Sequence, residues 1–258
     1  MTEFEITKKL KTSGVNLSVF DVVDSTNTVI RNMANDGFGE KTVVVANEQT
    51  QGRGRKGRSF FSPSDSGIYM SILLRPEKEI KDAVLITAAA AVCVARAIDK
   101  VCGVNSEIKW VNDIYIDDKK VCGILAESAI DPNTASAKYI ILGIGVNLYH
   151  PKNNFPTEIQ NIAASVLASK DDVDLRNDLV AEIIDEFFGI YPNVSSKKLY
   201  DEYKNRLMLI GKDVTVYNAD KEYEATVVDL DESFRLCVKK KNGEKIQLNS
   251  GEVSTKLS

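Results

Sequence analysis

The chain has 258 residues, of which 43% are hydrophobic and 27% are charged, a composition typical of a globular protein. Its formal net charge of −4 argues against general nucleic-acid binding, because contacts to phosphates require a basic surface. The single histidine, His150, argues against a histidine-ligated catalytic metal and against a Ser-His-Asp triad, so catalysis is expected to use carboxylates, cations and backbone amides.

The sequence contains no apolar run of the roughly 18 residues that a membrane-spanning helix requires. The N-terminus lacks the basic and apolar regions of a signal peptide, and residues 1–14, with one expected helical turn, are too few for a winged helix. The four cysteines form no C-x-x-C pair, which favours reduced thiols over disulfides or a zinc site. We therefore expect a cytoplasmic protein that binds neither membrane nor DNA.

Hydrophobic periodicity predicts the elements of the larger, N-terminal part of the chain. Alternating or β-branched runs predict strands at residues 17–23, 42–46, 67–74, 107–116, 120–126 and 139–147. Amphipathic or alanine-rich runs predict helices at residues 29–34, 82–102, 162–167, 176–191 and 195–208. The first of these helices follows Asp24–Asn27, whose polar side chains are typical of an N-cap.

The character of the sequence changes at Gly211. Beyond this residue, short alternating strands are predicted at residues 214–217, 223–230, 235–240 and 245–248, with a turn at Asn242-Gly243. Short strands separated by tight turns predict a small β-barrel. We therefore expect two domains, of residues 1–209 and 210–258.

Residues 52–58, GRGRKGR, place four cationic side chains among three glycines. The spacing satisfies G-x-G-x-x-G, but a dinucleotide-binding fold would begin a helix here, whereas residues 59–63 (SFFSP) predict a loop. Inward-turned glycine amides and guanidinium groups together form a cradle for phosphate or carboxylate. The alternatives are a solvated basic loop and a weak RNA contact.

Four separated segments resemble, in the same order, the motifs of biotin–protein ligases: DSTN (24–27), EQTQGRGRKGR (48–58), KWVND…KKVCGIL.E (109–127) and GIGVN (143–147). The chain resembles the monofunctional type, biotin–[acetyl-CoA-carboxylase] ligase, which lacks the N-terminal DNA-binding domain. The resemblance implies an α+β fold, in which a mixed β-sheet flanked by helices, of the class II synthetase-like kind, precedes an SH3-like β-barrel.

The resemblance also implies an activity. Biotin is expected to be activated with ATP and Mg²⁺ to biotinyl-5′-AMP, and the biotinyl group is then transferred to a lysine of a biotin carboxyl carrier protein of a carboxylase. A homodimer is compatible with this family.

Residues that match the family motifs receive roles from the resemblance. Those implied to bind biotin are Ser25, Thr26, Asn27, Gln49, Gly52, Arg53, Gly54, Arg55, Lys120 and Gly123. Those implied to bind ATP are Arg55, Arg58, Phe60, Asn112, Asp113 and Asn147. Arg53, Lys120 and Asp113 are the implied catalytic residues, and Asp113 is also the implied ligand of Mg²⁺.

The residue types suit these ligands. A hydroxyl and an amide, as at Thr26 and Gln49, offer the paired donors and acceptors that a neutral ureido ring requires. Asn112 and Asp113 have low β-propensity in a strand context, and such local inconsistency is typical of a functional site. These assignments have structural alternatives: an N-cap for Ser25 and Thr26, a strand-end surface position for Gln49, and a turn or bulge for Asp113.

Two positions depart from the family pattern. Val111 replaces the proline of KWPND, which removes no reactive group, and Phe60 occupies a position where many relatives have tryptophan. Phe60 is expected either to stack on adenine or to be buried, whereas Trp110 is expected in the core.

Three other functions are alternatives. Lipoate or octanoate transfer uses the same fold, but the GRGRKGR loop argues against it. A biotin sensor without catalysis is disfavoured by the retained Lys120 and Asp113, and a nucleic-acid-binding module is disfavoured by the acidic balance of the chain.

Like charges crowded into residues 53–58 repel one another when no anion is bound, so we predict that this loop is disordered until biotin and ATP bind. Limited trypsin digestion followed by mass spectrometry is expected to show cleavage between Arg53 and Arg58 that biotin plus ATP suppresses. Cleavage that the two ligands leave unchanged would contradict the prediction.

Overall fold

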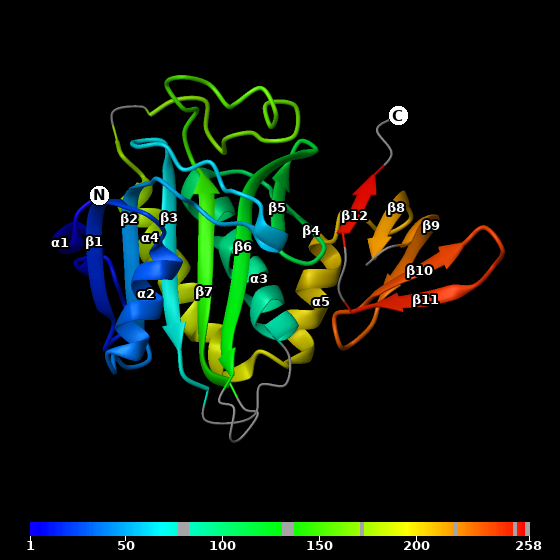
Figure 1. Cartoon of the computed structure of the whole chain (residues 1–258), viewed down its shortest axis with the longest axis horizontal. Coiled ribbons are helices and arrows are strands. Elements are labelled where there is room, and N and C mark those ends of the chain that lie inside the picture. Colours follow the sequence, from blue (N-terminus) through cyan, green and yellow to red (C-terminus); the bar gives the residue numbers. More distant parts are fainter. Residues whose placement is uncertain (77–82, 131–136, 171–172, 219–220, 250–251, 256–258) are drawn as a thin grey trace.

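The computed structural model describes residues 1–76, 83–130, 137–170, 173–218, 221–249 and 252–255. Its larger sheet contains, in spatial order, β1 (Asn16–Val23), β2 (Thr42–Gln49), β3 (Gly67–Leu74), β7 (Ala137–Asn147), β6 (Lys119–Ile130), β5 (Asp113–Ile116) and β4 (Glu107–Lys109) (Figure 1). β1 pairs with β2 in parallel, whereas the other neighbouring strands of the described sheet pair antiparallel. The mixed sheet implied by the resemblance is therefore confirmed.

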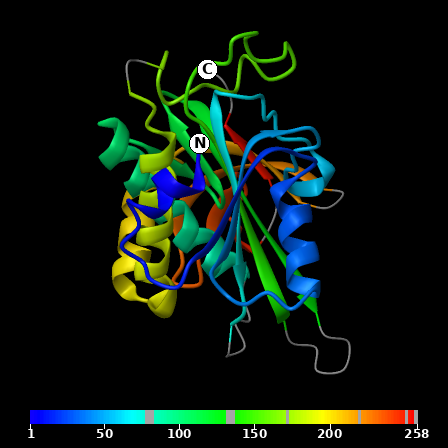
Figure 2. The ribbon, with the colours of Figure 1, turned by 90° about the vertical axis from the view of Figure 1, so that its left-hand side faces the viewer.

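Helices cover both faces of this sheet. α2 (Thr26–Asn35) lies on one face, and α3 (Ala83–Cys102), α4 (Arg176–Ile190) and α5 (Lys197–Arg206) lie on the other, as the turned view in Figure 2 shows. The short α1 (Glu3–Thr7) packs against α4, and 3-10 turns occur at η1 (Arg55–Gly57) and η2 (Tyr191–Asn193). Asp82, the predicted first residue of the long helix, lies outside the described residues. No helix within the described ranges is long and apolar enough to cross a membrane.

The hydrophobic core occupies both faces of the sheet, because the period-two alternation of strands divides their side chains between two sides. On β2, Val43 and Val45 belong to the large cluster that includes α3 and α4, whereas Val44 belongs to the smaller cluster under α2. The consecutive alanines Ala88–Ala91 of α3 are fully buried. Their small side chains allow this helix to pack closely on the sheet, as the alanine-rich pattern predicted.

The predicted helix at residues 162–167 is wrong. This segment runs alongside neighbouring strands, where Lys120 pairs with Ala163 and Tyr149 pairs with Leu167 in isolated parallel bridges. Backbone hydrogen bonds of 2.8 to 2.9 Å connect the segment to β6 and to the residues at and after the end of β7. These tertiary hydrogen bonds satisfy the backbone groups that a helix would have paired internally, and they override the amphipathic pattern.

The predicted strand at residues 107–116 is interrupted. β4 ends at Lys109 and β5 begins at Asp113, and the intervening residues 110–112 form a turn with a cis peptide bond between Trp110 and Val111. Trp110 is only 5% exposed, which confirms its expected place in the core.

The smaller C-terminal sheet is antiparallel. Its strands in spatial order are β11 (Lys245–Leu248), β10 (Leu236–Lys240), β9 (Lys221–Leu230), β8 (Asp213–Asn218) and β12 (Glu252–Thr255). β12 was not predicted; it is a short strand that pairs with β8, far from it in sequence. The five-stranded sheet fits the SH3-like domain implied by the resemblance, and a domain boundary between residues 209 and 210 stays a prediction.

Two buried aromatic side chains connect the turn at residues 110–112 to the C-terminal part of the chain. Trp110 Nε1 donates to Phe234 O at 2.8 Å, and the Tyr203 hydroxyl of α5 donates to Val111 O at 3.1 Å. The rings of Tyr203 and Phe234 meet edge to face with their centroids 5.2 Å apart. The turn that leads into β5 is therefore held from outside the large sheet.

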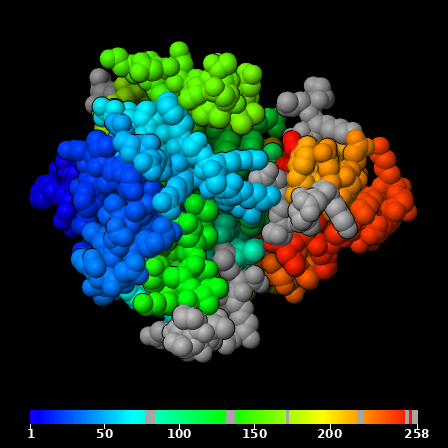
Figure 3. All heavy atoms as spheres, in the orientation of Figure 1, coloured from blue at the N-terminus to red at the C-terminus, as the bar shows by residue number. Residues whose placement is uncertain are grey.

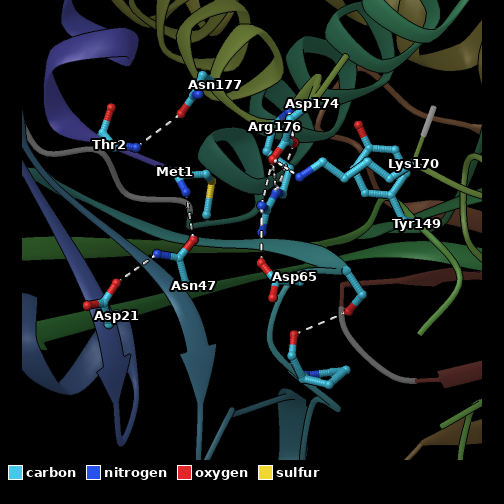
Figure 4. Close-up of polar contacts among 12 residues, drawn as sticks. Met1, Thr2, Asp21, Asn47, Asp65, Tyr149, Lys170, Asp174, Arg176 and Asn177 are labelled. Atoms are coloured by element: carbon cyan, nitrogen blue, oxygen red, sulfur yellow. Dashed lines mark hydrogen bonds and ion pairs between the residues drawn. The ribbon is translucent and has the colours of Figure 1, made fainter. Parts of the chain in front are cut away.

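A buried ion pair fixes the start of α4 (Figure 4). Arg176, 3% exposed, donates to both carboxylate oxygens of Asp174, with Nη2 2.6 Å from Oδ2, and its Nη2 lies 3.4 Å from Asp65 in the loop before β3. Burial of Asp174 opposes its ionisation, but hydrogen bonds from Arg176 and Lys170 outweigh that effect and hold the pKa of Asp174 well below its usual range.

We predict that Asp174→Asn lowers the free energy of unfolding by about 3 kcal/mol at neutral pH, because it leaves the buried Arg176 guanidinium with only the exposed Asp65 as a counter-charge. The folded-state pKa of Asp174 is depressed, so its stabilising contribution is complete above the unfolded-state value of about 3.9 and is lost as pH falls toward the folded value. Urea unfolding at neutral and acid pH is expected to show a difference in the free energy of unfolding between Asp174→Asn and wild type. This difference is expected to narrow only below about pH 4.

The control variant is Asp201→Asn, which breaks the exposed pair that Asp201 forms with Lys197 at 3.1 Å. Exposed pairs contribute little, so this variant is expected to unfold almost like wild type at every pH. Equal destabilisation by both substitutions would contradict the burial argument.

Candidate active site

A cleft of about 560 Å³ lies on the face of the large sheet that carries α2. β6 and β7 form its floor, and the start of α2, residues 53–60 and the C-terminal residues Tyr217 and Val253 form its walls. Figure 3 views this face, where the cyan segment that includes residues 53–60 crosses the sheet toward the orange and red C-terminal sheet. The cleft is therefore built from segments far apart in the sequence.

Most of the site residues predicted from the sequence meet at this cleft. Its lining includes Ser25, Thr26, Asn27, Gln49, Arg53, Gly54, Arg55, Arg58, Phe60, Asn112, Asp113, Lys120 and Gly123. Gly52 and Asn147 are the predicted residues outside the described lining. Gly52 is buried beside it, and Asn147, at the end of β7, donates from Nδ2 to Ala164 O at 3.1 Å.

A relay of hydrogen bonds organises the neutral end of the cleft. The Thr26 N–H donates to Gln49 Oε1 at 2.9 Å, and Gln49 Nε2 donates to Ser62 Oγ at 3.0 Å. Ser62 in turn donates to Phe60 O at 2.9 Å. Ser25 occupies the N-cap position of α2, but its side chain makes no capping bond. The amide of Gln49 is thus fixed in orientation, and the strand-end surface alternative does not describe it.

Asn27, in the first turn of α2, is held on both sides of its amide. Its Oδ1 accepts from Ser71 Oγ on β3 at 2.6 Å, and its Nδ2 donates to Glu127 Oε2 on β6 at 2.7 Å. Gly143 on β7 makes room for this amide, because a Cβ there would collide with Asn27 Oδ1. Ser71 and Glu127 were not predicted as site residues.

The floor of the cleft has no side chains at its centre. Gly123 of β6 and Gly145 of β7 are register partners. A Cβ at Gly145 would lie 2.6 Å from the Phe60 ring, and a Cβ at Gly123 would lie 3.2 Å from Lys120 Nζ. Phe60 is half-buried on this floor and also lines the cleft, and its stacking on adenine stays a prediction.

The charged end of the cleft is a network around Asp113. Lys120 Nζ lies 2.8 Å from Asp113 Oδ1, and Asn112 Nδ2 donates to the same oxygen at 2.8 Å. Arg55 Nη1 donates to Asn112 Oδ1 at 2.7 Å, which brings the cationic loop into the network. Lys119, the neighbour of Lys120 on β6, is exposed. Of this adjacent pair of lysines, Lys120 is the one that lines the described cleft.

The cationic loop is a compact turn in this structure. Arg53 and Ser59 form an antiparallel bridge, and the Gly54 N–H donates to Arg58 O at 2.7 Å. A Cβ at Gly52 would collide with Phe60 O, so only glycine fits where the loop leaves β2. Arg53 and Arg58 are exposed at the mouth of the cleft, whereas Arg55 is half-buried. The predicted change from disorder to order on ligand binding stays a prediction.

Several cleft residues were not predicted from the sequence. Lys109, the first residue of the KWVND motif, lines the cleft with its Nζ 5.1 Å from the centre of the Tyr115 ring, and burial lowers the pKa of Lys109. Because Lys109 belongs to the KWVND motif, the sequence could have predicted it as a site residue. Ile162 was assigned to a helix, and Tyr217 comes from the C-terminal sheet, so no local pattern placed either of them at the cleft.

The donor set fits a metal ion that is held mainly by a substrate. Within the described ranges, no group of three or more His, Cys, Asp or Glu side chains is placed to hold a metal. Asp113 supplies one carboxylate at the charged end. Mg²⁺ in nucleotide sites is commonly bound by one or two carboxylates together with substrate phosphates. The single carboxylate of Asp113 is therefore compatible with such a site.

Comparison with known families agrees with the geometry. The family model described as biotin/lipoate A/B protein ligase matches residues 19–147, which is half of the chain. The model described as biotin protein ligase C-terminal domain matches residues 209–256.

Individual relatives extend the comparison. The bifunctional ligase/repressor BirA of Bacillus subtilis is 39% identical over 168 residues, which are 64% of this chain and 51% of that protein. A biotin–[acetyl-CoA-carboxylase] ligase of Mycobacterium tuberculosis is 26% identical over 218 residues, 82% of this chain and 77% of that protein. The chain spans about half the length of the Bacillus relatives that it matches.

A solved structure of similar fold is the biotin protein ligase of Aquifex aeolicus in complex with biotin and ATP. It matches with a TM-score of 0.78 and 25% identity, and covers 94% of this chain and 99% of that one. With the fold, the cleft and the family models in agreement, this chain belongs to the biotin/lipoate A/B protein ligase family.

Proposed function

We propose that this chain is a biotin–protein ligase, which activates biotin with ATP to biotinyl-5′-AMP and transfers the biotinyl group to a lysine of a carrier protein. The observation that carries the proposal is the polarity of one cleft, with neutral groups at Thr26 and Gln49 and cationic groups at Arg55 and Lys120. Biotinyl-adenylate has the same polarity, with a neutral ureido ring at one end and an acyl-phosphate further along. The biotin- and ATP-bound relative of similar fold supports the assignment.

In the first step a carboxylate oxygen of biotin attacks the α-phosphorus of ATP, and the bond to the departing pyrophosphate breaks. Both reactants are anionic, so the main task of the site is to offset charge and to align the two groups. Lys120, on β6, and Arg55, on the cationic loop, supply positive charge. The ion pair with Asp113 at 2.8 Å holds the ammonium group of Lys120 in place before the ligands arrive.

The cationic loop then shields the product of this step. Arg53 is exposed at the mouth of the cleft, within a loop that glycines allow to move over an anion. A mixed anhydride is hydrolysed by water, so a loop that excludes water preserves the intermediate until the carrier arrives.

In the second step the amine of the carrier lysine attacks the carbonyl carbon of the mixed anhydride, and AMP leaves with the electron pair of the broken C–O bond. Asp113 accepts the proton that the amine loses. The carrier domain docks at the mouth of the cleft, where Tyr217 of the C-terminal sheet forms part of the wall.

The proposal includes Mg²⁺ and a reducing compartment. Asp113 would hold the ion together with phosphate oxygens of ATP, and the ion would neutralise phosphate charge when bound. The cysteines that the structure describes are free, which fits the cytoplasm.

The most direct test incubates the protein with labelled biotin, MgATP and a biotin carboxyl carrier domain. We expect label on the carrier, no label on a carrier whose acceptor lysine is replaced by arginine, and biotin-dependent exchange of pyrophosphate into ATP. Transfer of labelled lipoate or octanoate, with none of biotin, would overturn the proposal in favour of the other activity of this fold.

Lys120→Ala is expected to reduce biotin-dependent ATP–pyrophosphate exchange by about 10²–10³-fold, because it removes a preorganised charge at the reacting groups. Lys119→Ala is the matched control, since Lys119 is the exposed neighbour on the same strand. Equal activity of the two variants would remove Lys120 from the mechanism.

Arg53→Ala is expected to retain adenylation but to release biotinyl-adenylate into solution, because the loop no longer covers the intermediate. Chromatography of the free nucleotides measures the released fraction. Lys56→Ala, an exposed cation of the same loop, is the control and is expected to release less. Wild-type retention by Arg53→Ala would contradict the shielding role.

A further inference from the structure

Two polar side chains, one buried and one half-exposed, lie behind the neutral end of the cleft. Ser71 of β3 is fully buried, and Glu127 of β6 pairs with Arg31 of α2 at 3.1 Å. Neither Ser71 nor Glu127 belongs to the lining that the described residues form. Asn27 and Thr26, which do line the cleft, connect these two side chains to the space for the ligand.

The charge of Glu127 determines the orientation of the Asn27 amide. A carboxylate has no hydrogen to donate, so the nitrogen of Asn27 must face it, as the 2.7 Å contact between Nδ2 and Oε2 indicates. The other side of the amide, Oδ1, then faces Ser71 Oγ at 2.6 Å. Two oxygens at this distance need a hydrogen between them, so the single proton of Ser71 is committed to Asn27.

The same assignment of hydrogens to acceptors determines the orientation of the Thr26 hydroxyl. Ser71 Oγ also lies 2.7 Å from Thr26 Oγ1, and Gln49 Oε1 lies 3.1 Å from it. Because the Ser71 proton is used by Asn27, the Thr26 proton goes to Ser71 or to Gln49. In either case the Thr26 proton is engaged by a protein acceptor, so Thr26 Oγ1 has a lone pair, and no proton, available to a ligand in the cleft.

We propose that Glu127 is a positioning residue that acts through Asn27 and Ser71 to make Thr26 a hydrogen-bond acceptor for a ring N–H of the ligand. This inference rests on the proposed function, in which the ligand is the ureido ring of biotin, a cyclic urea with one hydrogen on each nitrogen. A ring nitrogen that carries an alkyl group leaves the Thr26 lone pair unpaired. The site therefore selects ureas with a free N–H, since an unpaired buried polar group opposes binding.

Glu127→Gln tests this chain of bonds with a side chain of nearly the same shape. The glutamine amide can donate as well as accept, so the Asn27 amide is free to turn over. The direction of the hydrogen bonds from Asn27 through Ser71 to Thr26 is then no longer fixed. We expect the KM for biotin to rise about tenfold, the value of one neutral hydrogen bond, while kcat and the KM for ATP stay close to wild type. The second readout is the ratio of kcat/KM for biotin to that for each mono-N-methylated biotin, which we expect to fall by about tenfold for one of them.

Arg31→Gln is the matched control, because it removes the other partner of Glu127 but leaves the carboxylate that orients Asn27. It is expected to keep the wild-type KM for biotin and the wild-type ratio. Ser71→Ala is the second variant; it breaks the relay without touching Glu127 and is expected to reduce the ratio as Glu127→Gln does. Thermal unfolding of all three variants shows whether each one is folded.

The outcomes separate the inference from the proposed function. Wild-type protein without biotin-dependent ATP–pyrophosphate exchange would overturn the function itself. An active wild type, together with unchanged ratios in folded Glu127→Gln and Ser71→Ala, would overturn only the role of Glu127. A fall in kcat with an unchanged ratio would also overturn it, because a merely structural role produces that result.

Discussion

The site depends on a patch of sheet that carries no side chains. Gly123 and Gly145 face each other across β6 and β7, and Gly143 lies two residues before Gly145 on the same strand. Glycine inside a strand costs about 0.5–1 kcal/mol relative to alanine, so its repeated use marks a close approach by other groups. Phe60, Lys120 and the amide of Asn27 occupy the space that Cβ atoms would fill.

The cleft gathers cationic groups although the chain is acidic, which suits the anionic ligand that we propose. The net charge is −4, yet the charged side chains that line the cleft from β6 and from the loop after β2 are cationic. Asp113 pairs with Lys120 directly and is connected to Arg55 through Asn112. Its negative charge therefore offsets the repulsion between these two cations before a ligand is present. The turn before Asp113 is in turn held by Phe234 and Tyr203, so the C-terminal sheet contributes to the geometry of the charged end.

Much of the fold could be predicted from the sequence where the local pattern and the tertiary environment agree. β3 is a run of eight buried residues, and α3 is an alanine-rich helix, and both were expected close to their observed bounds. Residues 162–167 failed because their helical pattern competes with backbone hydrogen bonds to β6 and to residues at the end of β7, partners that no local window contains. β12 was missed for the same reason, since its pairing partner β8 is distant in sequence.

The residues of the candidate site also fall into those that a local motif predicts and those that only tertiary contacts reveal. Charged and glycine-rich motifs predicted the cationic loop, Lys120 and Asp113, because such residues are unusual in their local sequence context. Ser71 gave no signal, because a serine in a strand looks like an ordinary half-exposed position until the structure shows it buried and bonded to Asn27. Glu127 ends the motif at residues 109–127 but received no role from the sequence, and the structure shows its bond to Asn27. Their significance lies in the direction of hydrogen bonds, which only three-dimensional contacts define.

The central claim is that an acyl-adenylate lies on the glycine floor beneath the cationic loop. A crystal structure of the protein soaked with biotin and ATP tests it most directly. We expect density for the adenylate along β6 and β7, with the guanidinium of Arg53 turned onto its phosphate. Ligand bound elsewhere, with the loop directed into solvent, would contradict the account.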